Sequence, residues 1–217
     1  MQILERILEE KLFAIVRGVA PEKILPTAQA IADGGIHALE ITFDHKTPNG
    51  IEKTLESISL LHKHCGLDIL LGAGTVLSAQ EVEQAADAGA EYMISPDTNH
   101  EVIRRTKELG KISIPGAYSP TEALEAHRAG ADLVKLFPAG LMGPAYVKAV
   151  CGPLGFIRFT AVGNINETNI PEFLKAGVQG FGIGGNLVDL EAIAQNRFSA
   201  LTETARKLVH AVKTGTQ

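Results

Sequence analysis

A lysine interrupts the apolar run DLVKLFP at residues 132–138. Lys135 is flanked by Val134 and Leu136, as expected for a strand that is covered on both faces. Burying an ammonium group is expensive unless the group has a partner or loses its charge. A neutral amine can attack a carbonyl carbon and form a Schiff base. The pattern therefore predicts a buried lysine with either a structural partner or a chemical role.

Two further charged residues lie in or directly after predicted strands. Glu40 lies inside the run HALEITF, and Arg17 follows the apolar run FAIV. Burial and a nearby Arg17 would both lower the pKa of Lys135 from the ordinary lysine value of about 10.4. Glu40 would then serve as the general acid and base. The alternative is that Lys135 and Glu40 form a buried ion pair that only stabilises the protein.

These residues belong to a regular alternation of apolar, β-rich runs and helical patterns. Several of the helical patterns begin at a Ser, Asn or Thr cap and end at a glycine. The apolar runs are LFAIV (12–16), ALEIT (38–42), DILLG (68–72), EYMIS (91–95), ISIPG (112–116), DLVKL (132–136), IRFTA (157–161) and GFGIG (180–184).

Eight strands alternating with helices in 217 residues predict an α/β fold, a (β/α)8 TIM barrel with an N-terminal helix. We expect a single barrel domain over residues 1–217. A doubly wound open sheet is the alternative. The first strand, however, continues as IVRGVAPE, which lacks the glycine-rich turn of a dinucleotide-binding sheet.

The composition limits the class of partner. The net charge of −5 argues against nucleic acid and acidic membranes as partners. No apolar run approaches the roughly 20 residues of a membrane span. Cys65 and Cys151 have no CxxC spacing, which predicts a reducing cytoplasm and no disulfide framework. The histidines form no metal-binding pattern, so no metal is expected, although His45 and His100 fall in loops that can reach a substrate.

In a TIM barrel the active site lies at the carboxyl ends of the strands, and the last two loops often bind phosphate. Here those loops read AVGNIN (161–166) and GIGGNLV (182–188). Their backbone N–H groups can approach an anion closely where glycine removes the side chain. Such residues are otherwise ordinary turn formers. The phosphate-binding candidates are Gly163, Asn164, Gly184, Gly185 and Asn186.

Two earlier loops carry residues that can bind the carboxylate end of a small acid, opposite the proposed phosphate site. The segment GAGTV (72–76) carries the hydroxyl of Thr75, which can hold a carboxylate or carbonyl oxygen. Pro96, in the segment ISPD (94–97), and Phe137 can form apolar walls. By themselves these are common loop residues.

Several of these segments, in this order, resemble the 2-keto-3-deoxy-6-phosphogluconate / 4-hydroxy-2-oxoglutarate aldolases over essentially the whole chain. The resemblance implies a (β/α)8 barrel, a homotrimer, and no metal or organic cofactor. It also implies cleavage of a 2-keto-4-hydroxy acid to pyruvate and an aldehyde such as glyceraldehyde 3-phosphate or glyoxylate. The matching segments are LEITF (39–43), GAGTVL (72–77), ISP (94–96), IPGAYSPTE (114–122), VKLFPA (134–139) and GIGGN (182–186).

The resemblance also implies roles for individual residues. Lys135 corresponds to the Schiff-base lysine and Glu40 to the general acid/base. Thr75 corresponds to the residue that helps to hold the pyruvate carboxylate. Pro96 and Phe137 correspond to the walls around the pyruvate unit, and Arg17 stands where many members have an arginine in the motif IRG.

The sequence departs from the family pattern at the substrate end. Asp44 stands where familiar members have a carboxylate-binding arginine, for which Lys46 or Arg17 would have to compensate. The familiar PTGG reads AVGN at 161–164, and Asp97 and Asn186 replace a glycine and a serine. Three alternatives follow: a relative that acts on an unphosphorylated or differently configured keto acid, a phosphate-binding epimerase or synthase without Schiff-base chemistry, and a non-enzymatic keto-acid sensor or scaffold.

Overall fold

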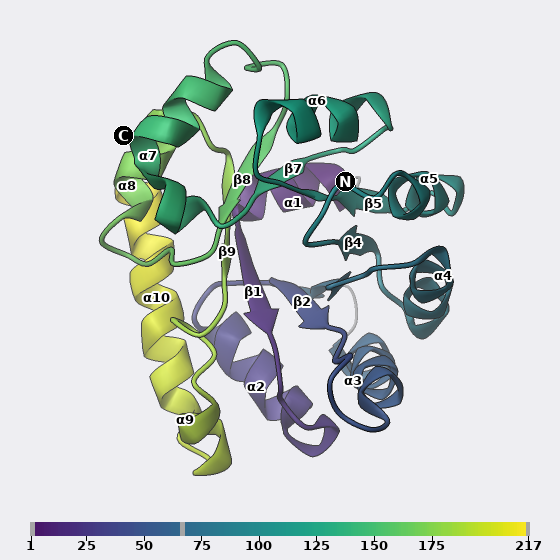
Figure 1. Cartoon of the computed structure of the whole chain (residues 1–217). Helices are drawn as coiled ribbons and strands as arrows, with labels where there is room; N and C mark the ends of the chain where they lie inside the picture. The colour runs from purple at the N-terminus through teal and green to yellow at the C-terminus, as the bar shows by residue number, and fades with distance from the viewer. Residues whose placement is uncertain (1–2, 66–67, 216–217) are drawn as a thin grey trace.

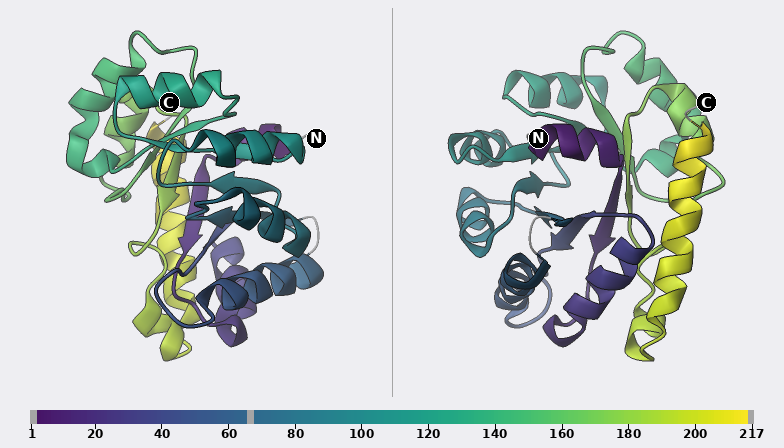
Figure 2. Two further views of the ribbon diagram at one scale, coloured as in Figure 1. Left: turned by 45° about the vertical axis from the view of Figure 1, so that its right-hand side comes forward. Right: turned by 180° about the vertical axis from the view of Figure 1, so that it is seen from behind.

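The computed structural model describes residues 3–65 and 68–215. One sheet of parallel strands, in the order β5-β4-β3-β2-β1-β9-β8-β7-β6, curves into a nearly closed barrel with helices on its outside (Figures 1 and 2). The predicted (β/α)8 barrel is confirmed. Its strands are β1 (Leu12–Val16), β2 (Ala38–Thr42), β3 (Leu70–Gly74), β4 (Tyr92–Ile94), β5 (Ile112–Ile114), β6 (Gly116–Ala117), β7 (Val134–Leu136), β8 (Phe159–Val162) and β9 (Gly180–Ile183).

The fifth barrel strand is broken in two. β5 pairs with β4 and β6 pairs with β7, and Pro115 lies between them. Proline has no N–H to donate to a ladder, so it interrupts the strand at this point. The two short segments together occupy the place of one strand in the eightfold pattern.

The helices surround the barrel, and α10 lies along α2 and α8, between the first and last parts of the ring (Figure 1). The predicted caps are present: Ser78 caps α4, and Ser119 forms a capping box with Glu122 at α6. The helices are α1 (Ile3–Glu10), α2 (Pro21–Asp33), α3 (Gly50–Cys65), α4 (Ala79–Ala88), α5 (His100–Glu108), α6 (Pro120–Arg128), α7 (Ala139–Cys151), α8 (Ile170–Ala176), α9 (Leu190–Ala194) and α10 (Phe198–Gly215).

Side chains alternate between two apolar clusters, one inside the barrel and one between the sheet and the helices. Leu133 belongs to the inner cluster, whereas Val134 and Leu136 belong to the outer one. Lys135 therefore points into the barrel, as the alternation predicts. Ile7 of the N-terminal helix α1 packs into the inner cluster, so the helix is part of the fold. Within residues 3–65 and 68–215, no helix has the length and hydropathy of a membrane span.

Several predicted strands are shorter than expected and two are displaced, one of them being the run expected at 157–161, which is observed as β8 at Phe159–Val162. The run expected at 68–72 is observed as β3 at Leu70–Gly74, because the ladder with β2 pairs Ala38 with Leu70 and Thr42 with Gly74. This shift brings Gly74 into the strand, which already contained Gly72 in the prediction. Both glycines face the interior, where they leave room for large side chains from neighbouring strands.

Gly72 leaves room for the ring of Tyr92, which is fully buried and lies edge-on to Phe13 with ring centroids 5.6 Å apart. A Cβ atom on Gly72 would lie 2.0 Å from Cε2 of Tyr92. We therefore expect Gly72→Ala to lower the free energy of unfolding by about 1–3 kcal/mol through overpacking. Denaturant unfolding tests this.

The matched control is Gly152→Ala, because the nearest atom to its added Cβ is the Lys148 carbonyl oxygen at 3.5 Å. The control should change stability by less than about 0.5 kcal/mol. Equal stability of the Gly72 and Gly152 variants would contradict the tight packing inferred around Tyr92.

Candidate active site

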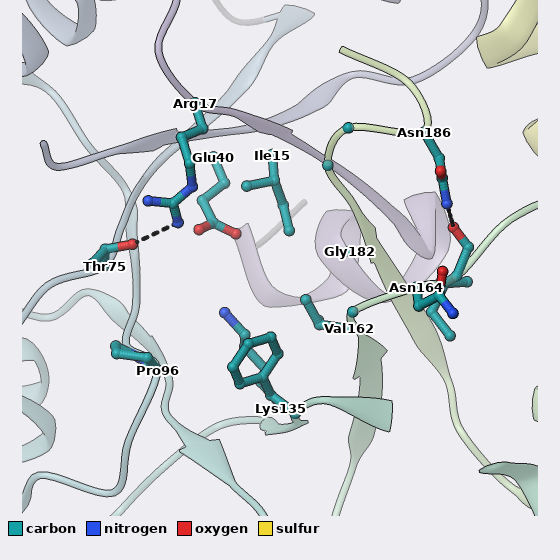
Figure 3. A pocket seen from close by; sticks show the side chains of 15 residues that line it. Ile15, Arg17, Glu40, Thr75, Pro96, Lys135, Val162, Asn164, Gly182 and Asn186 are labelled. Atoms are coloured by element: carbon teal, nitrogen blue, oxygen red, sulfur yellow. Dashed lines mark hydrogen bonds between the residues drawn. The ribbon is translucent and has the colours of Figure 1, made fainter. Parts of the chain in front are cut away.

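A cavity of about 400 Å³ opens at the carboxyl ends of the strands (Figure 3). It brings together all the predicted catalytic, substrate-binding and phosphate-binding candidates, from seven loops or strand ends. The lining consists of Ile15, Arg17, Glu40, Thr75, Pro96, Lys135, Phe137, Val162, Gly163, Asn164, Ile165, Gly182, Gly184, Gly185 and Asn186.

Lys135 projects into this cavity from the middle of β7. Its strand neighbours in register are Gly116 on β6 and Thr160 on β8, so the ladder fixes the backbone on both sides. The residue is only 7% exposed. Its Nζ lies 5.2 Å from the centroid of the Phe137 ring, within the range of a cation–π contact.

Glu40 faces Lys135 across the cavity (Figure 3). Its carboxyl group lies over Gly74, where a Cβ atom would be only 1.8 Å from Oε1. Among the described residues, the ion pairs with an N–O distance of 4.0 Å or less do not include Lys135 with Glu40. The two groups are therefore separated by a space that can receive reacting atoms, and they do not form a closed structural ion pair.

Burial moves both groups towards their neutral forms. Desolvation lowers the pKa of the Lys135 amine, an effect that Arg17 reinforces and that Glu40 opposes. Desolvation also raises the pKa of the Glu40 carboxyl, against the opposing charges of Lys135 and Arg17. A neutral amine is a nucleophile, and a protonated carboxyl group can donate a proton to a departing hydroxyl. The arrangement therefore suits a nucleophile and an acid on opposite sides of the cavity.

Arg17 and Thr75 form a polar pair at one side of the cavity. Arg17 Nη2 donates a hydrogen bond of 3.0 Å to Thr75 Oγ1 (Figure 3). Thr75 has a left-handed backbone with φ of 57°. This conformation costs a β-branched residue on the order of 1–3 kcal/mol unless its surroundings hold it. The pair presents a cation and a hydroxyl, which suit a carboxylate ligand.

Pro96 and Phe137 line the cavity near Thr75 and Lys135, as the sequence predicts. Three apolar side chains that line the cavity were not predicted, those of Ile15, Val162 and Ile165, and neither was Gly182. Ile15 lies two positions before Arg17, so the period of two along the strand was a signal for it. Val162, Ile165 and Gly182 line the cavity because of how β8 and β9 are placed in the barrel, and the loop motifs alone do not specify this placement.

The loops after β8 and β9 lie together at the far side of the cavity. Asn186 Nδ2 donates to the Ile165 carbonyl at 2.7 Å and ties one loop to the other (Figure 3). Gly163 and Asn164 both have positive φ angles, 94° and 57°. Among the described residues, no backbone carbonyl accepts from the N–H groups of Asn164 or Gly185. These loops can therefore offer backbone donors to an anion.

The structure accounts for the aspartate that replaces the family arginine. Asp44 does not line the cavity. Its carboxylate instead accepts hydrogen bonds from the N–H groups of Lys46 at 2.9 Å and Thr47 at 3.3 Å, and from the Thr47 hydroxyl. The Thr47 hydroxyl is the main cause of the lowered pKa of Asp44. The negative charge of Asp44 is thus stabilised by hydrogen bonds within its own turn, outside the cavity lining.

Of the two cations expected to replace the missing family arginine, Arg17 lines the cavity and Lys46 does not. The two loop histidines do not line the cavity either. His45 Nε2 lies 2.9 Å from Glu81 Oε1, and His100 is the exposed first residue of α5.

Comparison with known proteins agrees with this geometry. The family model described as "Aldolase: KDPG and KHG aldolase" matches residues 3–204. The chain belongs to this aldolase family. It is a carbon–carbon lyase, a metal-independent class I aldolase. The alternatives of a phosphate-binding epimerase or synthase and of a non-enzymatic binder are thereby set aside.

Individual relatives cover most of the chain. A probable 2-dehydro-3-deoxy-6-phosphogalactonate aldolase of Rhizobium meliloti (strain 1021) is 36% identical over 83% of this chain and 82% of its own length. A 2-dehydro-3-deoxy-phosphogluconate aldolase of Treponema pallidum (strain Nichols) is 33% identical over 97% and 96%. The crystal structure of a KDPG aldolase of Legionella pneumophila, with pyruvate captured as a covalent carbinolamine, has a TM-score of 0.84 at 30% identity, covering 96% of this chain and 98% of its own.

The separation of Lys135 and Glu40 yields a stability prediction. Because the pKa of Lys135 is lower in the folded protein, this group lowers the free energy of unfolding at pH values below the unfolded lysine pKa. Because the pKa of Glu40 is higher in the folded protein, this group lowers the free energy of unfolding at pH values above the unfolded carboxyl pKa. Both penalties are present at pH 7. The double variant Lys135→Met/Glu40→Gln should therefore be at least as stable as the native protein in denaturant unfolding at pH 7.

A structural ion pair provides the control. Lys107 Nζ lies 2.6 Å from Asp132 Oδ2, which also accepts a hydrogen bond from Ser113 N at 2.8 Å. Lys107→Met/Asp132→Asn should lose about 1–3 kcal/mol of stability. A loss of stability in the Lys135/Glu40 double variant as large as that of the control would instead indicate a pair that stabilises the fold, because replacing both members of a buried pair is otherwise neutral or stabilising.

Proposed function

We propose that this enzyme cleaves a 2-keto-3-deoxy-6-phospho sugar acid or 4-hydroxy-2-oxoglutarate to pyruvate and an aldehyde, through a Schiff base on Lys135. The observation that carries the proposal is a single buried lysine in the cavity, opposite an acid and separated from it. The Legionella pneumophila structure, which holds pyruvate as a covalent carbinolamine, supports the same chemistry. The aldehyde is glyceraldehyde 3-phosphate or glyoxylate, according to the substrate.

The reaction begins with attack of the neutral Lys135 amine on the C2 ketone. Protonated Glu40 gives its proton to the carbinolamine hydroxyl, and water leaves as the iminium forms. The resulting Glu40 carboxylate accepts the proton of the C4 hydroxyl, directly or through a water molecule. The C3–C4 electron pair then moves into the iminium, and the aldehyde departs. Proton return at C3 and addition of water release pyruvate and restore the amine.

The lining residues support a definite orientation of the substrate. Arg17 and the Thr75 hydroxyl would hold the C1 carboxylate, and Pro96 and Phe137 would enclose the pyruvate unit. Val162 would present an apolar contact to the middle of the chain, where the family motif has a threonine. The hydroxylated part of the substrate would therefore meet fewer polar groups than in relatives that carry this threonine.

The phosphate would lie against the loops after β8 and β9, at Gly163, Asn164, Gly184, Gly185 and Asn186. The N–H groups of Asn164 and Gly185, which have no backbone carbonyl acceptor in the described part of the chain, support this placement. The names of the Rhizobium meliloti and Treponema pallidum relatives, both aldolases of phosphorylated acids, support a phosphorylated substrate. The alternative within the family is an unphosphorylated or differently configured acid.

Three further properties are proposed, the domain and the compartment from the sequence pattern and the assembly from the family resemblance. We propose one domain over residues 1–217, assembly as a homotrimer, and action in the cytoplasm. Exposed apolar side chains, among them Tyr118 and the 79% exposed Leu141, offer surface for contact between copies.

Borohydride trapping tests the proposed nucleophile. The native protein, incubated with pyruvate and borohydride, should gain a reduced pyruvyl adduct on Lys135, located by peptide mass. Lys135→Met should show no adduct and no aldolase activity, since its thioether cannot attack a ketone. An unmodified Lys135 in active, folded native protein would contradict the Schiff-base proposal.

A charge placed at the proposed phosphate end tests the substrate class. A Cβ atom on Gly185 meets no atom within 4 Å, so larger residues fit there. Gly185→Asp should lower kcat/KM for 2-keto-3-deoxy-6-phosphogluconate by about tenfold or more relative to Gly185→Asn, because like charges near a protein surface repel by a few kcal/mol. Pyruvate trapping on Lys135 should be the same in both variants. Equal kcat/KM values would indicate that no phosphate binds there.

A further inference from the structure

The backbone of Thr75 needs an explanation that the cavity does not supply. A left-handed conformation, with φ of 57°, is unfavourable for threonine because its branched Cβ crowds the backbone. Such a residue keeps this conformation only when the surrounding structure fixes it. Because the Thr75 hydroxyl accepts a hydrogen bond from Arg17 in the cavity, whatever fixes this backbone also shapes the site.

Hydrogen bonds on both sides of Thr75 hold the segment in place. Before it, the Gly74 carbonyl accepts from Phe43 N at 2.8 Å. After it, Val76 N donates to the Ile94 carbonyl at 3.2 Å, and Leu77 N donates to Glu81 Oε2 at 2.6 Å. Glu81 belongs to α4 and is only 9% exposed. A short hydrogen bond to a nearly buried carboxylate is among the stronger contacts in a loop.

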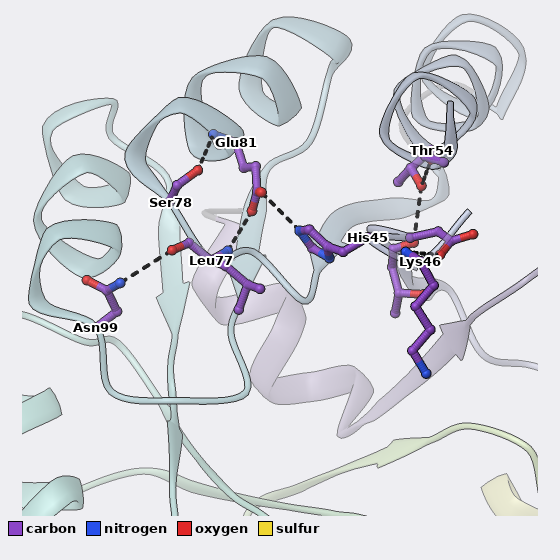
Figure 4. Close-up of polar contacts among 10 residues, drawn as sticks. His45, Lys46, Thr54, Leu77, Ser78, Glu81 and Asn99 are labelled. Atoms are coloured by element: carbon purple, nitrogen blue, oxygen red, sulfur yellow. Dashed lines mark hydrogen bonds and ion pairs between the residues drawn. The ribbon is translucent and has the colours of Figure 1, made fainter. Parts of the chain in front are cut away.

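The other oxygen of the same carboxylate reaches a different loop. His45 Nε2 donates to Glu81 Oε1 at 2.9 Å (Figure 4). The His45 ring lies 6.1 Å from the ring of Phe43, which is buried at the end of β2. Glu81 therefore joins the loop after β2 to the loop after β3 through one carboxylate.

A third loop completes this arrangement. The Leu77 carbonyl accepts from Asn99 Nδ2 at 3.4 Å (Figure 4). The Asn99 side-chain oxygen is itself fixed, because it accepts from the N–H groups of Glu101 and Val102 at the start of α5. Both backbone polar groups of Leu77, two positions after Thr75, are thus held by side chains from outside its own loop.

We infer that Glu81 and His45 are positioning residues for the substrate carboxylate: they hold Thr75 in its left-handed conformation, with its hydroxyl beside Arg17. The inference rests on the proposed carboxylate-binding role of Thr75. Neither Glu81 nor His45 lines the cavity, so their loss should weaken pyruvate binding without altering the reactivity of Lys135.

A purely structural role for Glu81 makes a different prediction. Glu81 also lies in the first turn of α4, where a carboxylate stabilises the start of a helix, and its side chain accepts from Leu77 N just before the Ser78 cap. If capping were its whole role, replacing its side chain would lower the unfolding midpoint and leave pyruvate binding unchanged. The concentration of pyruvate that gives half-maximal trapping therefore separates the two roles.

The test compares Glu81→Ala, Glu81→Gln and His45→Ala with the native protein. Glu81→Ala should raise the half-saturating pyruvate concentration in borohydride trapping by about tenfold, which corresponds to about 1.4 kcal/mol. The maximal trapping rate should change by less than about twofold. Glu81→Gln keeps an acceptor for Leu77 N and should restore most of the affinity, and His45→Ala should lie between.

Glu83→Ala is the matched control. It removes the same charge from the same helix, where the Glu83 carboxylate pairs only with Arg105 Nε at 2.9 Å among the described ion pairs. Its half-saturating pyruvate concentration should equal the native value. If Glu81→Ala and His45→Ala also showed the native half-saturating concentration, the inference would be overturned, whatever the stability of these variants.

The Thr75→Gly variant tests whether Glu81 affects pyruvate binding through Thr75. Glycine adopts the left-handed conformation without a side-chain penalty. In a Thr75→Gly background, Glu81→Ala should therefore raise the half-saturating concentration by less than about twofold, a clear departure from additivity. Additive effects would overturn the inference. Failure of the native protein to trap pyruvate on Lys135 would instead overturn the proposed function, and the inference with it.

Discussion

Desolvation of one amine is the constraint on which the rest of the site depends. Lys135 lies in the interior of the barrel, where its ammonium form is disfavoured, and Glu40 is too far away to form a close ion pair with it. A neutral lysine is what Schiff-base chemistry requires. The same burial raises the pKa of the Glu40 carboxyl, so one physical effect favours the neutral form of both proposed catalytic groups. In the proposed mechanism, the cost of burying these two groups accompanies the reactivity of the amine.

Glycines on β3 make this arrangement possible. Gly74 leaves the space that the Glu40 carboxyl group occupies, and Gly72 leaves the space for the Tyr92 ring in the same strand. The Tyr92 ring belongs to the inner apolar cluster, which also contains Leu133 from just before β7. The polar cavity therefore rests on a tightly packed apolar interior that shields it from the opposite end of the barrel.

The sequence predicted most of this arrangement from local patterns. The bounds of β1 and β2 follow from apolar runs, and alternation along the strand places Lys135 inside the barrel. Other features depend on contacts between distant segments and could not be read in this way. The register of β3 depends on its ladder with β2, and the break at Pro115 depends on which neighbour each half pairs with. The hydrogen bonds of the Asp44 carboxylate within its own turn and the contact between His45 and Glu81 likewise depend on how the loops are placed in space.

The most direct test of the central claim is the pH dependence of pyruvate trapping on Lys135. The second-order rate constant for adduct formation reports the fraction of neutral amine in the free enzyme. We expect this rate constant to rise with pH and level off, with its half-maximum below the ordinary lysine pKa of about 10.4, because burial lowers the pKa of Lys135. A rate constant that still rises through about pH 10.4 would show that Lys135 remains an ordinary charged lysine, and would contradict the account.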